Sequence, residues 1–432
     1  MENKIRVFLA KNYDLVVGDT FQLFFRGVVE VPNPYCYSIV TLCEVGKSFP
    51  RYFEYTPQKV GKHTLTISVY NAEKTLLGTA TTTLNVVSAK APKTNANVLC
   101  LGDSLTQGGV WVKEVNRRIS ATDGEPEGNG IENVKFIGSM KKDGVGFEGH
   151  GGWTWKSYVS DKVGSIWIQA PNDKTEKDQH SLWLDEYGSI WQIETLQVDY
   201  LKLNRYKDHD GKRPEKGVLT HYKNAVDTSP IEFFSSSNGD VNPFLDTENK
   251  TLSVKKYLES LGENSLDVVY ILLGANGLMR QCAMNKSRRE YCQTIIKREV
   301  KELLDLLLKD IPTVKIKIMA MPMPSVNGGM GSNYGAELPF ADLYDIITYG
   351  TELNTAYQEI CSEDKYKGSV EFIHLAGQFD SEYNYPFTLK KVNSRSQSTE
   401  RLDTNARHPS VDGQMQIADA VYRNLIKELG NF

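Results

Sequence analysis

The pattern of apolar residues changes near residue 97, and this change constrains the fold more than any other feature of the sequence. Up to about residue 88, short alternating segments separated by glycine turns are typical of a β-sandwich. From residue 97 onwards, apolar runs alternate with longer helical segments, as in a parallel α/β sheet. A chain of 432 residues is also too long for one ordinary core. We therefore expect a β-sandwich domain at 1–88, a polar, proline-containing linker at 89–96 and an α/β domain at 97–432.

The α/β domain has a regular alternation of elements with one long interruption. The expected strands are Val98–Leu101, Val134–Ile137, Val268–Leu273, Val314–Met319 and Val370–Ile373, and the expected helices lie near 297–310, 341–362 and 412–428. Residues 160–250 are polar and aromatic, and they are too many for a simple connection between a strand and a helix. We expect an inserted lobe there, beside the functional site, because loops at the carboxyl ends of parallel strands carry function.

Composition and charge exclude several classes of protein. Hydrophobic residues make up 40% and charged residues 24%, as in a soluble globular protein, and no apolar run approaches the roughly 20 residues of a spanning helix. We therefore expect no membrane insertion. The net charge is −4 and neither sign gathers into a long block, so we expect no nucleic-acid partner. The first residues show no signal peptide. A cytoplasmic or virion-associated location, or a chain from which a signal has been removed, all stay open.

The six cysteines show no Cys-x-x-Cys spacing that would indicate a zinc or redox site. We interpret them as free thiols, although Cys36 and Cys43 could pair across the sandwich. His150 has Asp143 and Glu148 near it in the sequence, but no second histidine stands at ligand spacing. We therefore expect neither a metal ion nor a cofactor.

Ser104 is the candidate nucleophile. It belongs to the segment Gly102-Asp103-Ser104-Leu105, which directly follows the first α/β strand and precedes a helical run. A serine at that position stands at the carboxyl end of a strand and close to backbone N–H donors. Since a serine hydroxyl is a weak nucleophile until a base takes its proton, this hypothesis requires a histidine.

His408 is the candidate base among the seven histidines. It lies in a loop just before the terminal helix, and Pro409 favours an extended conformation at His408. A late loop of an α/β sheet can return to the edge at which the first strand ends. His374, by contrast, alternates with the apolar residues of the fifth strand and is interpreted as a core histidine.

Two glycine-containing segments fall between these residues and could supply hydrogen-bond donors. Gly149–Thr154 follows the second strand, and Gly274-Ala275-Asn276 follows the third. Glycine lets a backbone N–H approach a ligand closely, and an asparagine amide is a good neutral donor. With the Ser104 N–H, these groups would form an oxyanion hole, which is usually the largest single contribution to acyl transfer.

These four segments, in this order over about residues 97–430, resemble the four conserved blocks of the SGNH (GDSL) hydrolase superfamily. The resemblance implies a flavodoxin-like three-layer α/β/α fold in which Ser104, Gly152, Asn276 and His408 have the four roles that name the superfamily. The preceding domain, expected to be immunoglobulin-like, is similar to the arrangement in some bacterial carbohydrate O-acetyl esterases of this superfamily.

One position departs from the pattern of the superfamily. The family commonly places an aspartate three residues before the histidine, where it orients the imidazole, whereas this chain has Asn405. The amide oxygen of Asn405 could accept the Nδ1–H bond, but it cannot stabilise imidazolium by charge. Asp403 is an alternative orienting residue, and a Ser104–His408 dyad supported by a backbone carbonyl is the third possibility.

The expected function is hydrolysis of a small acyl ester, with O-acetylated carbohydrate as substrate. The carbohydrate part depends on the resemblance and on the aromatic lobe, because Trp and Tyr faces stack on sugar rings. The aromatic residues of this lobe include Trp167, Trp183, Trp191, Tyr200 and Tyr206, although aromatic residues in such a lobe form its core more often than a sugar-binding surface. Two alternatives remain: a lipid or thioester acylhydrolase, and a glycan-binding or virion-tail structural module on an SGNH fold. The oligomeric state is left open.

Overall fold

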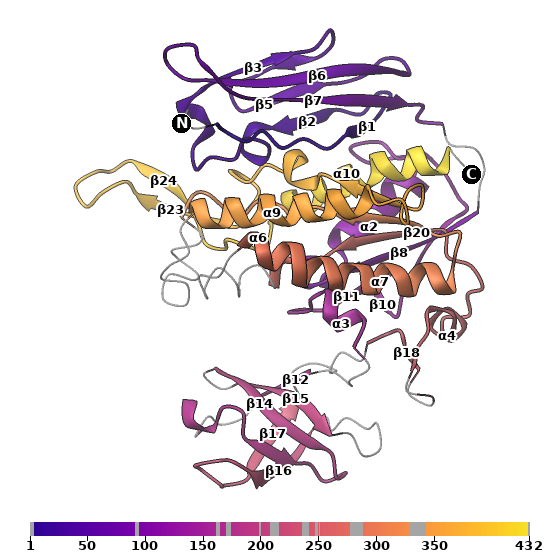
Figure 1. Ribbon diagram of the computed structural model, residues 1–432, viewed down its shortest axis with the longest axis vertical. Helices are drawn as coiled ribbons and strands as arrows, with labels where there is room; N and C mark the ends of the chain where they lie inside the picture. Colours follow the sequence, from indigo (N-terminus) through magenta and orange to yellow (C-terminus); the bar gives the residue numbers. More distant parts are fainter. Residues whose placement is uncertain are drawn as a thin grey trace. The chain divides into compact units, whose positions relative to one another are not determined.

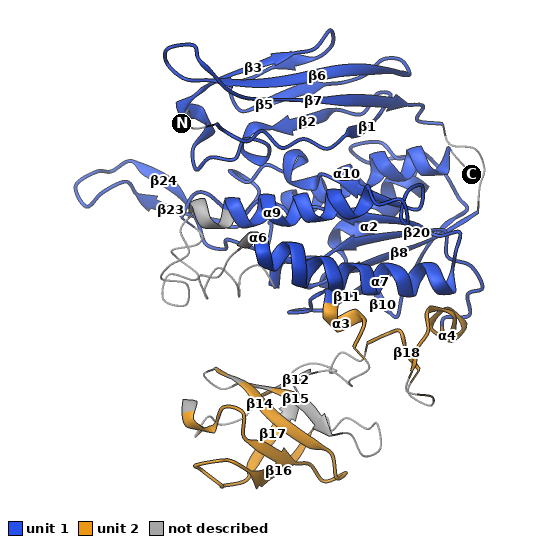
Figure 2. Cartoon of the chain, viewed as in Figure 1, with its two compact units in different colours: residues 1–155, 261–432 blue, residues 156–260 orange. Residues whose placement is uncertain are grey.

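The computed structural model describes residues 4–90, 95–160, 165–169, 174–197, 200–207, 216–235, 242–246, 249, 251–276, 288–328 and 343–430. Contacts divide the chain into two compact units, one made of residues 1–155 and 261–432 and the other of residues 156–260 (Figure 2). The first unit therefore includes residues on both sides of the expected linker.

The N-terminal part of the first unit contains two small sheets that share one hydrophobic core (Figure 1). One sheet has the order β1-β7-β6-β3 and the other the order β2-β5-β4. Their strands are β1 (Asn12–Val16), β2 (Phe21–Phe24), β3 (Ser38–Leu42), β4 (Lys47–Ser48), β5 (Tyr52–Tyr55), β6 (Gly61–Tyr70) and β7 (Leu76–Val87). Alternate residues of both sheets, such as Phe21 and Leu65, point into the shared core. Cys36 and Cys43 are free thiols.

The second part of this unit is a seven-stranded sheet in the order β10-β11-β8-β20-β21-β22, with β9 paired to β8. Its strands are β8 (Ala96–Gly102), β9 (Val134–Ile137), β10 (Met140–Lys142), β11 (Val145–Gly149), β20 (Val268–Leu272), β21 (Lys315–Met319) and β22 (Val370–Ile373). All pairs are parallel except β10 with β11. Because β9 and β11 lie along the same edge of β8, the parallel strands follow the flavodoxin-like order 2-1-3-4-5.

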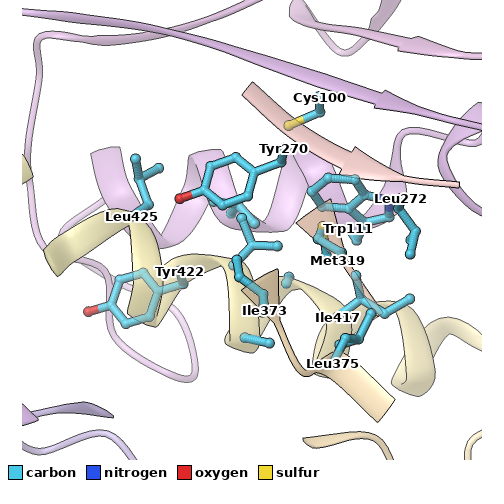
Figure 3. Packing of buried hydrophobic residues seen from close by; sticks show 14 of the residues in the cluster. Cys100, Trp111, Tyr270, Leu272, Met319, Ile373, Leu375, Ile417, Tyr422 and Leu425 are labelled. Atoms are coloured by element: carbon cyan, nitrogen blue, oxygen red, sulfur yellow. The ribbon is translucent and has the colours of Figure 1, made fainter. Parts of the chain in front are cut away.

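Helices α2 (Val110–Ser120) and α10 (Val411–Leu429) pack against one face of this sheet. Figure 3 shows part of this core, to which the helices contribute Trp111, Ile417 and Tyr422 and the strands contribute Cys100 and Tyr270. Among the described residues, the unit also contains α1 (Ser104–Gln107), α6 (Arg288–Tyr291), α7 (Lys297–Asp310) and α9 (Leu343–Cys361), and α3 (Trp155–Tyr158) begins at its boundary. Helices α7 and α9 contact each other, and α9 contacts β22. A two-stranded ribbon, β23 (Phe387–Lys391) and β24 (Thr399–Asp403), precedes the last loop.

Buried charges join the N-terminal sheets to the α/β part. Arg118 of α2 and Arg423 of α10 both donate to Asp19, at 2.5 and 2.9 Å. The guanidinium of Arg118 also lies 3.6 Å from the centre of the Tyr422 ring. These contacts are among those that join the chain on either side of residues 89–96 into one compact unit.

The second unit contains a closed antiparallel barrel in the order β12-β15-β14-β13-β16-β17. The barrel strands are β12 (Ser165–Gln169), β13 (Leu182–Leu184), β14 (Ile190–Gln197), β15 (Tyr200–Lys207), β16 (Lys216–Lys223) and β17 (Ile231–Ser235). The unit also contains a two-stranded sheet of β18 (Leu245–Asp246) and β19 (Thr251–Leu252), and the helix α4 (Val254–Ser260). Trp183 and Trp191 are fully buried in the barrel core. They therefore cannot stack on sugars, whereas the side chains of Trp167, Tyr200 and Tyr206 lie outside the described residues.

Within the described part of the chain, we find no helix with the length and apolar character needed to span a bilayer.

Candidate active site

Ser104 lies where β8 ends and the short helix α1 begins. Asp103 caps this helix by accepting a hydrogen bond from the Leu105 backbone N–H at 3.0 Å. The turn is tight, because a Cβ atom at Gly102 would come within 2.0 Å of Thr106 Oγ1. The sequence Gly102-Asp103-Ser104 therefore fixes the serine at the carboxyl edge of the parallel sheet.

His408 reaches this serine from the loop between β24 and α10. Its Nε2 atom lies 2.9 Å from Ser104 Oγ, although 304 positions separate the two residues in the chain. Ser410 caps α10 by accepting from the Gly413 N–H at 3.3 Å, which ends the loop two residues after His408. Burial, with a smaller contribution from the Arg407 charge, lowers the pKa of His408 below its ordinary value. This lowering favours the neutral form of the imidazole, which a general base requires.

The contact between Asn405 and His408 differs from the one expected from the sequence, in which the amide oxygen accepts the Nδ1–H bond. Its Oδ1 atom accepts hydrogen bonds from the backbone N–H groups of Arg407 and His408, both at 2.9 Å. This leaves Nδ2 of the amide facing His408 Nδ1, at 3.4 Å. In this geometry Asn405 holds the backbone of the loop, and its oxygen is not placed to accept an Nδ1–H bond from His408.

Asp403, the alternative orienting residue, is fully buried at the end of β24. Among the described residues, its carboxylate accepts from Ser325 Oγ at 2.5 Å and from Arg401 Nε at 2.7 Å. Neither contact involves His408. The described part of the chain thus brings together a Ser104–His408 pair, with Asn405 facing the imidazole through its nitrogen and Asp403 bonded to Ser325 and Arg401.

Asn276 follows β20 and lies next to the nucleophile turn. Its Nδ2 atom donates to Asp103 Oδ2 at 3.2 Å and to the carbonyl of Trp153 at 2.9 Å. Its Oδ1 atom accepts from Arg407 Nη2 at 2.9 Å. The block Gly274-Ala275-Asn276, the block around Trp153 and the nucleophile turn are therefore joined through one amide.

Gly152 lies in the loop after β11, which pairs with the last residues of β8. Its φ of +79° lies in the left-handed region, which favours glycine. The loop is attached to the nucleophile strand, because the His150 N–H donates to the Gly102 carbonyl at 3.1 Å. The role of the Gly152 N–H as an oxyanion donor stays a prediction.

The side chain of His150 makes contacts that belong to the packing of the fold. Its Nε2 atom lies 3.1 Å from the buried carboxylate of Glu148, and its ring stacks on Trp153 with the centroids 4.1 Å apart. In the residues that the structure describes, no group of three or more His, Cys, Asp or Glu side chains could hold a metal ion.

Two further residues belong to this site that the sequence did not single out. Asp103 is fully buried, and burial raises its pKa to about 7, against the opposing effects of its Leu105 hydrogen bond and the Arg407 charge. Arg407 contacts Asn276 and precedes His408. Their positions inside the Gly-Asp-Ser and Arg-His-Pro segments were the available signal, but only the folded chain shows what they touch.

The fold and the site together define a nucleophile–base pair of serine and histidine at the carboxyl edge of a flavodoxin-like sheet. Solved structures similar to the chain include a carbohydrate acetylesterase from Sinorhizobium meliloti, at 12% identity and a TM-score of 0.31, covering 77% of this chain and 98% of that one. An aryl esterase from M. smegmatis has 11% identity and a TM-score of 0.33, with coverages of 76% and 98%. A phospholipase A1 from Streptomyces albidoflavus NA297 has 10% identity and a TM-score of 0.33, with the same coverages.

These three structures carry the names of two esterases and one phospholipase. Comparison with protein-family models gives no match, and comparison with curated protein sequences gives none either. At such low identity and TM-score, the activity of the chain has to be argued from its own residues.

Proposed function

We propose that the chain is an SGNH-type serine esterase that removes small acyl groups, specifically O-acetyl groups, from carbohydrate. The observation that carries the proposal is the distance of 2.9 Å between Ser104 Oγ and His408 Nε2. A serine hydroxyl in contact with a neutral imidazole provides the nucleophile and the base that attack on an ester requires.

The reaction follows from the placement of these groups. Ser104 Oγ attacks the ester carbonyl while its proton passes to His408 Nε2, and the tetrahedral intermediate carries a negative charge on oxygen. The Ser104 N–H, the Gly152 N–H and Asn276 Nδ2 would stabilise that charge. Asn276 would exchange its longer bond, to Asp103 at 3.2 Å, for the oxyanion. His408 then returns the proton to the leaving alcohol, and water releases the acyl group from Ser104.

The carbohydrate part of the proposal rests on the aromatic lobe and on the resemblance of the preceding domain to the arrangement in some bacterial carbohydrate esterases of the SGNH superfamily. The burial of Trp183 and Trp191 removes part of the aromatic argument for sugar binding. We therefore expect the substrate-binding surface to be formed by residues other than these two tryptophans.

The test is a panel of substrates with matched variants. We expect release of acetate from acetylated polysaccharides, and a decline of kcat/KM for aryl esters as the acyl chain grows from acetate to decanoate. Ser104→Ala and His408→Ala should abolish turnover above a small residual rate while the circular dichroism spectrum stays unchanged. Preference for long acyl chains would favour a lipid acylhydrolase, and glycan binding without turnover would favour a binding module.

A further inference from the structure

Arg407 connects the loop that carries the proposed base to the proposed oxyanion donor. Its guanidinium Nη2 donates to Asn276 Oδ1 at 2.9 Å, across 131 positions of the chain. Its backbone N–H donates to Asn405 Oδ1, which fixes the start of the guanidinium side chain. The residue next to His408 therefore reaches the amide that we expect to bind the oxyanion.

Together with the Trp153 carbonyl and Asp103, the contact fixes the orientation of the Asn276 amide beside the nucleophile turn. An asparagine side chain can rotate by half a turn with little change of shape, exchanging its donor end for its acceptor end. Here Arg407 occupies the oxygen, so the nitrogen faces the Trp153 carbonyl and Asp103. The rotated amide would place its oxygen against the Trp153 carbonyl and repel the negative charge of the tetrahedral intermediate.

We propose that Arg407 is a positioning residue of this site, which holds the Asn276 amide with its nitrogen toward the developing oxyanion. The inference rests on the proposed esterase function. In this role Arg407 acts through Asn276 and not directly on the reacting bond. The charge of Arg407 has a second consequence: after burial, it contributes to the lowered pKa of His408, and it opposes the burial that raises the pKa of Asp103.

A double-mutant cycle separates this role from direct binding of substrate. We expect Arg407→Met to lower kcat for an aryl acetate by about 10- to 100-fold, since it disorders one oxyanion donor. KM should change by less than about twofold, and Arg407→Lys should recover part of the loss. In an Asn276→Ala background, Arg407→Met should cost less than about twofold more, because the group it positions is absent.

Two outcomes of this cycle would overturn the inference. Equal losses of kcat with and without Asn276 would show that Arg407 acts independently of the amide. A rise of KM alone would show that it binds a substrate group. If Arg407→Met does not fold, as judged by circular dichroism, Arg407→Gln provides the second neutral variant. The acid limb of kcat/KM should also move to higher pH in the neutral variants, because the positive charge beside His408 is gone.

A measurement without turnover makes failure of the inference distinguishable from failure of the proposed function. In protein labelled with ¹⁵N-asparagine, the Asn276 side-chain NH₂ pair is identified by its loss in Asn276→Ala. We expect Arg407→Met to shift or broaden that pair, and Asp143→Asn, a surface control, to leave it unchanged. An unchanged pair in Arg407→Met contradicts the positioning role. If the wild type hydrolyses no ester, the proposed function fails while this spectrum still decides the contact.

Discussion

Asn405 presents its side-chain nitrogen to His408, with 3.4 Å between Asn405 Nδ2 and His408 Nδ1. Its oxygen is occupied by the backbone N–H groups of Arg407 and His408. A donor facing Nδ1 favours the tautomer with its proton on Nε2, whereas a base that accepts the Ser104 proton needs Nε2 unprotonated. The Ser104–His408 pair should therefore be less activated than it would be in a triad with aspartate.

We expect Asn405→Asp to raise kcat/KM for an aryl acetate by about tenfold or more. One carboxylate oxygen would keep both backbone hydrogen bonds, and the other would replace Nδ2 and accept the Nδ1–H bond. The carboxylate also stabilises imidazolium as the serine proton moves, a contribution that is worth up to about 10⁴ in complete triads. Asn405→Ala is the control, and it should lower activity by loosening the loop.

The same substitution should change the pH profile in a defined direction. The base acts when neutral, and burial and Arg407 lower the pKa of His408, so the acid limb of the wild type should lie below pH 6.5, the ordinary value. A carboxylate beside Nδ1 favours the charged imidazole, so the acid limb of Asn405→Asp should move to higher pH. Equal or lower activity with an unmoved limb would show that position 405 does not reach the imidazole.

Asp403→Asn should affect stability more than catalysis. The buried carboxylate contacts Ser325 and Arg401, and its replacement weakens a charge-assisted hydrogen bond at the base of the ribbon β23–β24. We expect a loss of about 1–3 kcal/mol in the free energy of unfolding, measured by urea denaturation. We also expect kcat to stay within about tenfold of the wild type at a permissive temperature. A loss of several orders of magnitude in kcat would instead identify Asp403 as the orienting carboxylate.

The sequence allowed the main strands of the α/β part and its long helices to be predicted within a few residues. Apolar runs such as Val268–Leu272 are buried on both faces of the sheet, so their signal is strong. The strand β11 was missed, because Val145–Gly149 contains two glycines and no apolar run. Ser104 and His408 were predicted from ordered motifs, and the structure brings these two residues into contact.

Contacts between distant side chains could not be predicted in the same way. Nothing in the order of residues shows that Arg407 reaches Asn276, or that the oxygen of Asn405 is occupied by its own loop. The lobe at 160–250 was predicted to exist but not to contain a barrel, since its short strands alternate too irregularly. The union of the N-terminal sheets with the α/β part depends on buried ion pairs that have no local pattern.

The substitution Asp19→Asn tests how much the buried ion pairs stabilise the contact between the N-terminal sheets and the α/β part. The side chains of Arg118 and Arg423 are 2% and 4% exposed, and both donate to this carboxylate. Removing the charge of Asp19 leaves Arg423 without this carboxylate and leaves Arg118 with Asp419. Breaking a buried pair typically costs about 3–5 kcal/mol, so we expect a loss near the lower end of that range in urea denaturation. The control Asp143→Asn breaks a surface pair with Lys113 and should leave stability unchanged. Equal free energies of unfolding for Asp19→Asn and Asp143→Asn would contradict the prediction.

His374 provides a second probe of the same contact between the N-terminal sheets and the α/β part. It follows β22, is fully buried, and its Nδ1 atom lies 2.6 Å from the hydroxyl of Tyr13 in β1. Burial lowers the pKa of His374 to about 3 from an ordinary value of 6.5. The neutral imidazole can accept the Tyr13 hydrogen bond, whereas the imidazolium cannot accept it at Nδ1.

A depressed pKa in the folded state gives a stabilisation that is present above pH 6.5 and is lost as the pH falls towards 3, because the unfolded chain takes up the proton first. The slope is about 1.4 kcal/mol per pH unit within that window. His374→Asn keeps an acceptor for Tyr13 close to the position of Nδ1 but cannot be protonated. We therefore expect the variant to lose stability less steeply than the wild type between pH 6.5 and 3, whatever its stability at pH 7. Parallel curves of unfolding free energy against pH, from urea denaturation at half-unit intervals, would show that His374 is not the residue responsible.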